Sequence, residues 1–464
     1  MLKFKIFIPV LLSSFALFSQ ANIEVHVLKL SGELSNGDLP IQQLDINKEL
    51  NVEKPSKIRL YPNIEFQTIE GVGGAFNEIG GEALMSLPKT LQTEVMFNLF
   101  GKDKAGFSYC RTAVGASDFG IDAYSYSEVP EDYTMKHFSI KREKKTVITY
   151  IQKAIEINPD LKIFASPWSP PAWMKYSGAM DGGNEFPEKN QLRDDPKIYQ
   201  AYALYFSKYI EAYAKKGITV DRLVIQNETD ANTKYPSNDM SVTQMSSFVK
   251  NYLRPQFTQD EIDTEIWAGT FRTHGRLDAV ELAANKEYRK LFDGIGIQYT
   301  SGVYIQQTQD LFPEVKLMHT EGVCYDGKNT WDQASRRLKE IAGYINRGVP
   351  NYCYWNIILN ETTESGWGWK QNSLINIDRE EKEVTYNPDY AVIAFVSKYL
   401  VKGAKRIANF SRDDLISLKY NNQIIVLVQN DGRTPKAYEY QLEDEEGQQF
   451  EIPAKSLAAI VIKK

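Results

Sequence analysis

The segment RLVIQNE (residues 222–228) is an apolar run of strand length that ends on a carboxylate. The segment KLMHTEG (residues 316–322) has the same form, and its carboxylate is Glu321. A parallel strand that is buried on both faces has an almost continuous apolar sequence. Side chains at the C-terminal ends of such strands lie where barrels carry their functional groups. These segments therefore predict a parallel sheet with Glu228 and Glu321 at its functional edge.

Similar short apolar runs recur between residues 66 and 400 and alternate with segments of helix length. This alternation is typical of βα units around a parallel sheet. The amphipathic segment 198–217 ends in two lysines and a glycine, which favours a helix that stops there. The number of candidate strands fits a TIM (β/α)8 barrel. They are residues 70–76, 107–114, 162–168, 222–228, 265–271, 293–299, 316–322 and 351–356.

The regions on either side of the barrel have a different pattern. Residues 22–65 and 401–464 contain alternating apolar and polar runs that are separated by turn sequences such as Asn-Asp-Gly-Arg at 430–433. We expect these two regions to pair as a β-sandwich attached to the barrel of residues 66–400. The predicted fold class is therefore α/β, and 464 residues are enough for both parts.

Residues 1–21 have the form of a signal peptide. Lys3 and Lys5 precede an apolar run, and Ser19-Gln20-Ala21 resembles a cleavage site. The run is too short to span a bilayer comfortably, and no later segment is long and apolar enough to do so. We expect an exported protein, periplasmic or extracellular, without a stable membrane anchor.

Composition argues against several classes of partner. The net charge of −6 disfavours a nucleic-acid partner. The three cysteines, Cys110, Cys324 and Cys353, lie in or just after predicted strands and are expected to be buried core residues. Four scattered histidines do not form a metal-ligand pattern, so no metal or organic cofactor is expected.

A barrel brings the ends of its fourth and seventh strands to one central cleft, so Glu228 and Glu321 can face the same ligand. Hydrolysis of a glycosidic bond needs a proton for the leaving oxygen and a carboxylate for the cationic carbon. Burial and neighbouring charge can keep one carboxyl protonated and the other ionised. A single strand-end glutamate more often forms an ordinary salt bridge, so the pair is what favours catalysis.

Six segments in chain order resemble the glucosylceramidase-type enzymes of glycoside hydrolase family 30. They are QTIEGVGGAF (67–76), CRTAVGASDFG (110–120), ASPWSPPAWMK (165–175), IQNE (225–228), HTEG (319–322) and WNIILN (355–360). The resemblance implies a retaining hydrolase that forms a covalent glycosyl-enzyme. It implies that Glu228 is the acid/base and Glu321 the nucleophile, with carboxyl groups about 5 Å apart.

The same resemblance suggests residues that bind the substrate. Arg111 is expected beside the nucleophile, and Asn227 at the sugar 2-hydroxyl. Structural roles, such as an ion pair inside the barrel or a loop cap, remain alternatives for several of these positions. The full predicted set is Arg111, Asp118, Trp168, Asn227, Tyr299 and Trp355, with both tryptophans as walls of the glycone pocket.

The sequence also departs from the family. Thr229 follows the acid/base where a proline is usual, and Gln298-Tyr299-Thr300 replaces His-Trp-Tyr. Trp367 and Trp369 are candidates either for aglycone subsites or for loop anchors. We expect a carbohydrate or glycolipid substrate with a β-glucosidic bond. The alternatives are a β-1,6-glucan, a β-fucoside or a β-xyloside, and a non-catalytic carbohydrate-binding barrel.

Overall fold

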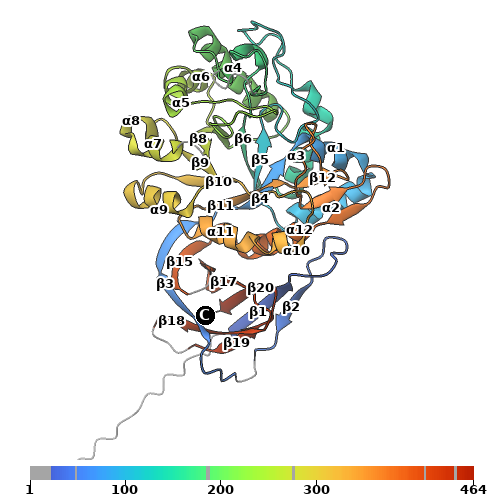
Figure 1. Ribbon diagram of the computed structural model, residues 1–464, viewed down its shortest axis with the longest axis vertical. Coiled ribbons are helices and arrows are strands. Elements are labelled where there is room, and N and C mark those ends of the chain that lie inside the picture. The colour runs from blue at the N-terminus through green and yellow to red at the C-terminus, as the bar shows by residue number, and fades with distance from the viewer. Residues whose placement is uncertain are drawn as a thin grey trace, which may run out of the picture.

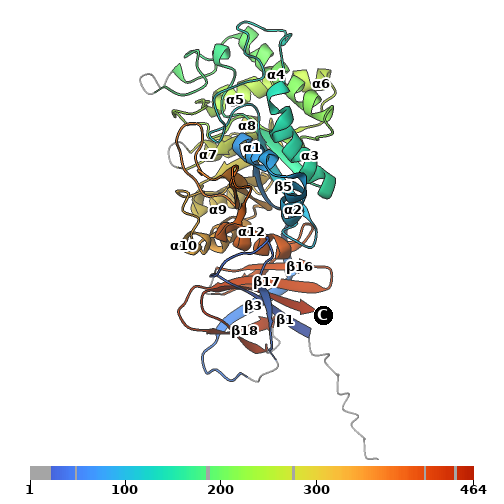
Figure 2. The ribbon, with the colours of Figure 1, turned by 90° about the vertical axis from the view of Figure 1, so that its right-hand side faces the viewer.

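The computed structural model describes residues 22–46, 50–183, 189–273, 277–411, 414–443 and 447–463. The predicted signal peptide, residues 1–21, lies outside the described residues. Figures 1 and 2 show two parts stacked along the long axis, a large barrel and a smaller β domain. Helix α12 (Pro388–Tyr399) lies at the junction between them in both views.

The larger part is a barrel of eight parallel strands, which confirms the predicted TIM-like architecture. Each strand overlaps one of the apolar runs recognised in the sequence. In spatial order the sheet reads β10-β9-β8-β7-β6-β5-β4-β11. The strands are β4 (Gly71–Phe76), β5 (Tyr109–Ala113), β6 (Lys162–Ser166), β7 (Arg222–Val224), β8 (Glu265–Phe271), β9 (Gly294–Gln298), β10 (Leu317–Glu321) and β11 (Asn351–Asn356).

Contacts between β10 and β11 close the barrel. The Gly322 backbone N–H donates to the Cys353 carbonyl at 2.7 Å. The Asn351 side chain donates to the His319 carbonyl at 2.8 Å and accepts from the His319 N–H at 3.2 Å. The Asn351 side chain thus supplements the backbone contacts between β10 and β11, and these contacts hold the end of β10 that carries Glu321.

The helices cover the outside of the barrel. Helix α4 (Pro196–Ala214) illustrates why they form, because the Asp195 side chain caps the Lys197 N–H and Gly217 adopts φ +75° beyond the last turn. The others are α1 (Glu78–Ser86), α2 (Lys89–Phe100), α3 (Val147–Ile157), α5 (Val242–Phe248), α6 (Arg254–Gln259), α7 (Asp278–Ala284), α8 (Lys286–Arg289), α9 (Gly302–Leu311), α10 (Trp331–Ala334) and α11 (Arg337–Ile345).

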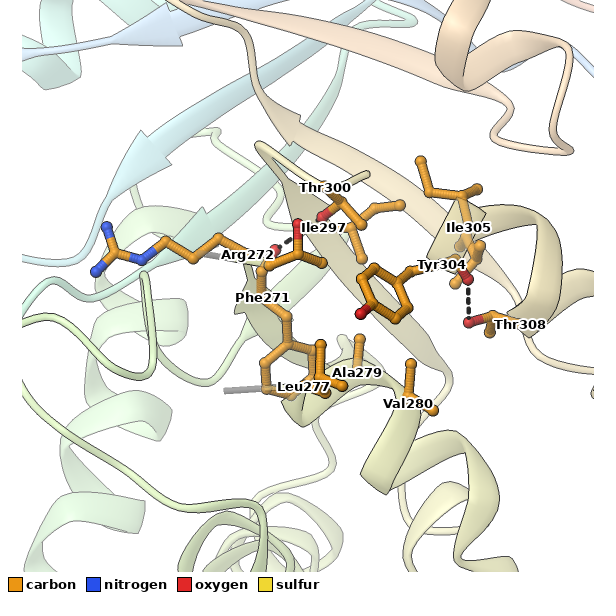
Figure 3. A pocket seen from close by; sticks show the side chains of 12 residues that line it. Phe271, Arg272, Leu277, Ala279, Val280, Ile297, Thr300, Tyr304, Ile305 and Thr308 are labelled. Carbon is orange, nitrogen blue, oxygen red and sulfur yellow. Dashed lines mark hydrogen bonds between the residues drawn. The ribbon is translucent and has the colours of Figure 1, made fainter. Parts of the chain in front are cut away.

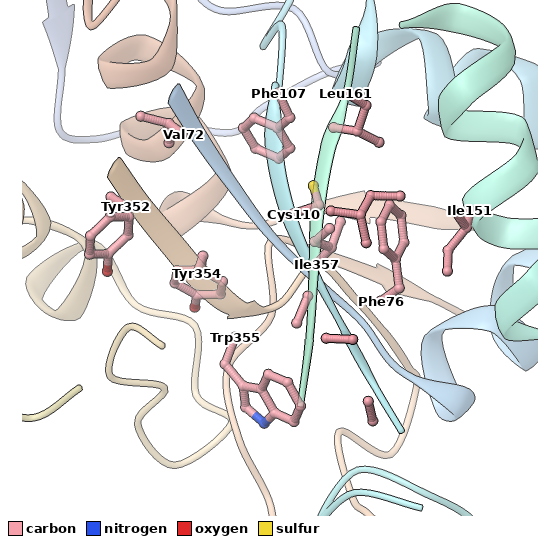
Figure 4. Packing of buried hydrophobic residues seen from close by; sticks show 14 of the residues in the cluster. Val72, Phe76, Phe107, Cys110, Ile151, Leu161, Tyr352, Tyr354, Trp355 and Ile357 are labelled. Atoms are coloured by element: carbon pink, nitrogen blue, oxygen red, sulfur yellow. The ribbon is translucent and has the colours of Figure 1, made fainter. Parts of the chain in front are cut away.

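Large apolar and aromatic side chains fill the space between the strands and the helices. Figure 4 shows Cys110 surrounded by Phe76, Phe107, Leu161 and Ile357. All three cysteines are buried and unpaired, as the sequence predicted. Fully burying one such apolar side chain contributes about 1.5–3 kcal/mol, so this layer holds the strand ends in place.

The β domain is one nine-stranded sheet of both chain ends, in the order β19-β18-β3-β15-β16-β17-β20-β1-β2. The terminal regions pair as predicted, but they form a single sheet that curls around its own core rather than two separate sheets. Val25, Ile58, Val426 and Ile460 belong to that core. The strands are β1 (Asn22–Lys29), β2 (Ile41–Leu44), β3 (Ser56–Thr68), β15 (Lys405–Phe410), β16 (Ile416–Tyr420), β17 (Gln423–Asn430), β18 (Lys436–Leu442), β19 (Gln449–Ile452) and β20 (Ser456–Lys463).

The two parts meet without a linker. Strand β3 continues past the expected boundary at residue 65, because Thr68 still pairs with Lys405 of β15. Asn346 Nδ2 donates to the Leu415 carbonyl at 2.8 Å, and Gln429 Nε2 donates to the Ser335 carbonyl at 2.6 Å. On the barrel side, a small sheet of β12 (Ile358–Asn360), β13 (Ile375–Ile377) and β14 (Val384–Tyr386) follows β11.

Candidate active site

A cavity of about 530 Å³ opens at the C-terminal ends of the barrel strands. It brings together six of the eight predicted site residues, which come from five different strand ends. Those six are Asp118, Trp168, Asn227, Glu228, Tyr299 and Glu321. The remaining lining residues are Tyr235, Arg272, Val323, Cys324, Trp369 and Gln371.

Glu321 is the last residue of β10 and has only 6% of its surface exposed. Arg111 Nη1 donates to Glu321 Oε2 at 2.6 Å, and the Tyr299 hydroxyl donates to Glu321 Oε1 at 2.5 Å. Burial raises the pKa of Glu321, while the Arg111 charge and the Tyr299 hydrogen bond oppose that shift. Both carboxylate oxygens are therefore held by strong donors that favour the ionised form.

Arg111 is itself fixed. Its side chain is fully buried on β5, and Nη2 donates to Ser166 Oγ at 2.7 Å and to Asn227 Oδ1 at 2.8 Å. The guanidinium carbon lies 4.4 Å from the centre of the Trp168 ring. Because every neighbour limits its movement, Arg111 places a fixed positive charge on the Glu321 side of the cavity.

Glu228 follows β7, and its surroundings differ from those of Glu321. Its φ of +44° lies in the left-handed region, and its backbone N–H donates to Thr270 Oγ1 at 3.0 Å. Burial raises the pKa of Glu228 to about 7 against the opposing charge of Arg272, and the negative charge of Glu321 adds to the rise. A left-handed glutamate is strained, and such residues cluster at functional sites.

The Gln298 amide interacts with both carboxyl groups. Gln298 Nε2 donates to Glu228 Oε1 at 3.4 Å, and a hydrogen bond from Gln298 also lowers the pKa of Glu321. Thr320 Oγ1 fixes the amide by donating to Gln298 Oε1 at 2.8 Å. One side-chain amide therefore reaches both carboxyls, which places them close together in the same cavity.

Asp118 and Asn227 supply further polar groups. Asp118 Oδ1 is buried and has no hydrogen-bond partner among the described residues. Burial and the charges of Glu321 and Glu228 raise the pKa of Asp118 well above its usual range. Asn227 Oδ1 accepts from Arg111 and, at 3.1 Å, from Thr270 Oγ1, so the amide NH₂ is the group left to donate to a ligand. An unpaired buried oxygen beside a free donor is a polar site that a hydroxylated ligand can satisfy.

The two predicted tryptophans differ in position. Trp168 lines the cavity, whereas Trp355 is fully buried and stacks against Trp168 with ring centres 4.9 Å apart. Of the two rings, that of Trp168 lies at the cavity and that of Trp355 does not. The ring of Trp355 lies against that of Trp168 and does not reach the cavity.

A comparison with known families identifies the class of enzyme. The glycosyl hydrolase family 30 TIM-barrel domain matches residues 69–400. The chain belongs to glycoside hydrolase family 30. It is therefore a hydrolase of O-glycosyl bonds from a retaining family, as the sequence predicted.

Relatives of this family 30 chain include glucosylceramidases and glucanases. "Putative glucosylceramidase 3" of Caenorhabditis elegans is 31% identical over 389 residues, which are 79% of this chain and 72% of the relative. An endo-1,6-β-D-glucanase of Neurospora crassa is 30% identical over 211 residues, 45% of this chain and 43% of the relative. The solved structure of SrfJ from Salmonella typhimurium has a TM-score of 0.85 at 22% identity, covering 95% of this chain and 99% of SrfJ.

Arg272 and Tyr235 line the cavity of this family 30 chain but were not predicted from the sequence. Arg272 directly follows β8, a position that could have been recognised because the strand itself was. Tyr235 lies in the loop after Glu228, and its ring centre is 5.2 Å from that of Trp369. No sequence pattern marks that pairing, because it depends on how two distant loops fold together. Trp367, in contrast, packs against the core and does not line the cavity.

Among the described residues, no group of three or more histidine, cysteine, aspartate or glutamate side chains is arranged to hold a metal ion. No helix in the described part of the chain is long and apolar enough to cross a bilayer. Thr229, which stands where the family usually has proline, donates its hydroxyl to Asp278 Oδ2 at 2.8 Å.

Proposed function

We propose that the protein is an exported β-glycosidase that hydrolyses β-glucosidic bonds, with Glu228 as acid/base and Glu321 as nucleophile. The observation that supports this assignment most strongly is the contrast between the two carboxyls of one cavity. Burial raises the pKa of both carboxyls, but Arg111 and Tyr299 oppose the rise at Glu321, whereas the pKa of Glu228 rises to about 7. Two carboxyls whose environments separate their pKa values are suited to opposite roles.

The reaction then proceeds in two displacements. The ionised Glu321 attacks the anomeric carbon while Glu228 gives its proton to the leaving oxygen. A water molecule then enters, Glu228 removes its proton, and the ester at Glu321 is hydrolysed. A retaining pair needs carboxyl groups about 5 Å apart. The reach of the single Gln298 amide to both residues supports a gap of that size.

The remaining polar groups suit a pyranose in the glycone position. The Asn227 amide donates to the 2-hydroxyl, a contact that strengthens in the transition state. Asp118 Oδ1 gains the hydrogen-bond partner that it lacks by contacting another hydroxyl. Trp168, which lines the cavity, provides an apolar surface for the C–H face of the sugar.

The aglycone side is aromatic. Tyr235 and Trp369 lie at the cavity with their rings tilted by 33°, and Trp369 is 37% exposed. Such rings can stack on a second sugar or contact an alkyl chain. The relatives that are named glucosylceramidases favour a glucosylceramide-like substrate. The aromatic pair and the glucanase relatives favour β-1,6-glucan as a second candidate.

A substrate panel tests this proposal. Purified protein is assayed on aryl β-glucoside, β-fucoside and β-xyloside, on glucosylceramide and on β-1,6-glucan, and the lengths of the products are measured. We expect the highest kcat/KM on a β-glucoside and a loss of turnover in Glu321→Gln. Glu156→Gln, an exposed position on α3, is the matched control. Slow release that is equal in wild type and Glu321→Gln would instead identify a non-catalytic carbohydrate-binding barrel.

Export is tested separately. The N-terminal residue of the mature protein is determined after secretion from the native host. The expected first residue is Asn22, because cleavage after Ala21 fits the signal-peptide pattern. A protein that keeps Met1 and stays in the cytoplasm would contradict this part of the proposal.

A further inference from the structure

Arg272 is the side chain that separates the catalytic cavity from a second, apolar pocket. It lines both spaces, and the apolar pocket is formed by residues of β8, β9, β10, α7 and α9 and of the segments between them. Figure 3 shows the Arg272 guanidinium pointing away from the apolar residues Leu277, Val280 and Tyr304. The charged end is thus directed to the catalytic side.

Two carboxylates share this guanidinium. Arg272 Nη1 lies 3.1 Å from Glu228 Oε2, and Arg272 Nε donates to Asp230 Oδ1 at 2.8 Å. The Arg272 side chain is 24% exposed, and those of Glu228 and Asp230 are 9% and 15% exposed. Partly buried pairs of this kind are screened less than surface pairs.

The ion pair favours one protonation state of Glu228. A guanidinium has N–H donors and no acceptor, so it cannot accept a hydrogen bond from a protonated carboxyl. The proposed first displacement needs protonated Glu228, and the second needs ionised Glu228. Arg272 therefore opposes the first state and stabilises the second.

We propose that Arg272 is a positioning residue that stabilises the base form of Glu228 for the second displacement, and that Asp230 limits its strength by sharing the guanidinium. This inference rests on the proposed role of Glu228. Once Glu321 is an ester, its negative charge no longer opposes ionisation of Glu228. Arg272 then faces a carboxyl that is ready to ionise and to accept a proton from water.

Other groups that face Glu228 come from every neighbouring element, and most of them oppose its ionisation. Glu321, Asp230 and burial raise the pKa of Glu228, while Arg272 and the Gln298 hydrogen bond lower it. The charged and titratable groups around it are Asp118 after β5, Asp230 and Tyr235 after β7, Arg272 after β8, Tyr299 after β9 and Glu321 on β10. Among the residues that the structure describes, Arg272 is the cation that lies beside it, since Arg111 pairs with Glu321.

The first test is the pH dependence of kcat/KM on a β-glucoside with a poor leaving group. Loss of the cation in Arg272→Met moves the alkaline limb upward by about one pH unit. Arg272→Lys keeps a cation and restores the limb toward that of wild type. In Asp230→Asn the Arg272 guanidinium pairs with Glu228 as its one remaining carboxylate. The pKa of Glu228 falls, so the alkaline limb moves to lower pH. A limb that stays in place in all three variants overturns the inference.

The second test separates the two displacements. With a dinitrophenyl β-glucoside the first displacement needs little acid help, so hydrolysis of the glycosyl-enzyme limits kcat. Arg272→Met then lowers kcat by about tenfold, the change that one pKa unit represents, while kcat/KM stays within about threefold. Equal losses in kcat and kcat/KM indicate a merely structural role and contradict the inference. Wild-type protein without activity, or Glu228→Gln with unchanged activity, would contradict the proposed function instead.

Discussion

The two ends of the barrel use the same residue types for different purposes. At the N-terminal end, Arg222 forms ion pairs with Glu70 at 2.7 Å and Glu265 at 2.8 Å, and it lies 4.5 Å from the Trp267 ring centre. At the C-terminal end, Arg111 pairs with Glu321 beneath Trp168. Each end therefore holds a buried arginine between a carboxylate and an indole.

The difference lies in the carboxylates. The side chains of Glu70 and Glu265 are 27% and 38% exposed, and together they occupy the Arg222 guanidinium. Glu228 and Glu321 are almost buried at the wall of a cavity, beside an unpaired Asp118 oxygen. A satisfied cluster at partly exposed carboxylates stabilises the fold, whereas the buried carboxyls at the cavity have shifted pKa values, and the unpaired Asp118 oxygen can still bind a ligand.

Replacing one glutamate at each end of the barrel should give the largest difference in kcat. Glu321→Gln removes the nucleophile and should lower kcat by on the order of 10⁴–10⁶-fold, the range for loss of a catalytic nucleophile. Glu70→Gln should leave kcat within about threefold and lower the free energy of unfolding by ~1 kcal/mol, since its ion pair is partly exposed. Steady-state kinetics and urea unfolding of both variants measure this. Similar kinetic losses in the two variants would remove the distinction between the ends.

Glu228→Gln tests the second carboxyl. Loss of general-acid help should lower kcat/KM by about 10²–10⁴-fold on substrates with poor leaving groups. The loss should be much smaller with dinitrophenyl glycosides, because their leaving groups need no proton. Azide is not repelled by the neutral amide of this variant, so it can enter the cavity and should restore turnover with a glycosyl azide product. A loss that is independent of the leaving group would argue against the acid role.

The pH profile sharpens the same comparison. Glu228 must be protonated in the free enzyme, and burial raises its pKa to about 7. The value of kcat/KM should therefore fall about tenfold per pH unit above this pKa. The raised pKa also affects the free energy of unfolding. The stability contributed by protonated Glu228 is fully present below pH 4.5, the ordinary pKa of the group, and is lost as the pH rises through about 7. An alkaline limb above pH 9 would show that Glu228 is not the titrating acid.

Arg222→Met should have the smallest kinetic effect. It leaves Glu70 and Glu265 without their cation, but both can reach water, so the cost is about 1–2 kcal/mol in the free energy of unfolding. The value of kcat/KM and its pH limbs should match those of wild type. Thermal unfolding and the pH profile of kcat/KM check both statements. A shifted pH limb would show that the two ends of the barrel are coupled.

The sequence predicted the barrel because its strands are buried on both faces, and the apolar runs that result can be recognised one at a time. Glu228 and Glu321 were found for the same reason, as they end two of those runs. The curled sheet was read as a sandwich because β3 lies between β18 and β15, strands that are more than 300 residues away.

Loop geometry limited the prediction of the site. Tyr235 and Trp369 meet only after two long loops have folded, and Arg272 gains its role from a distance to Glu228 that the sequence does not encode locally. Trp355 was expected on the cavity wall because of the resemblance to family 30. Its stacking under Trp168 depends on packing between strands that are not neighbours in the chain.

The central claim is that Glu321 forms a covalent bond with the sugar while Glu228 assists from the other side of the same cavity. Incubation with a 2-deoxy-2-fluoro-β-glucoside that has a good leaving group should trap this species, since the fluorine slows both displacements and the leaving group preserves the first. Peptide mass spectrometry should then find one fluoroglucosyl group on Glu321 and none in Glu321→Gln. A label on Glu228, on Asp118 or on no residue of an inactivated enzyme would contradict the account.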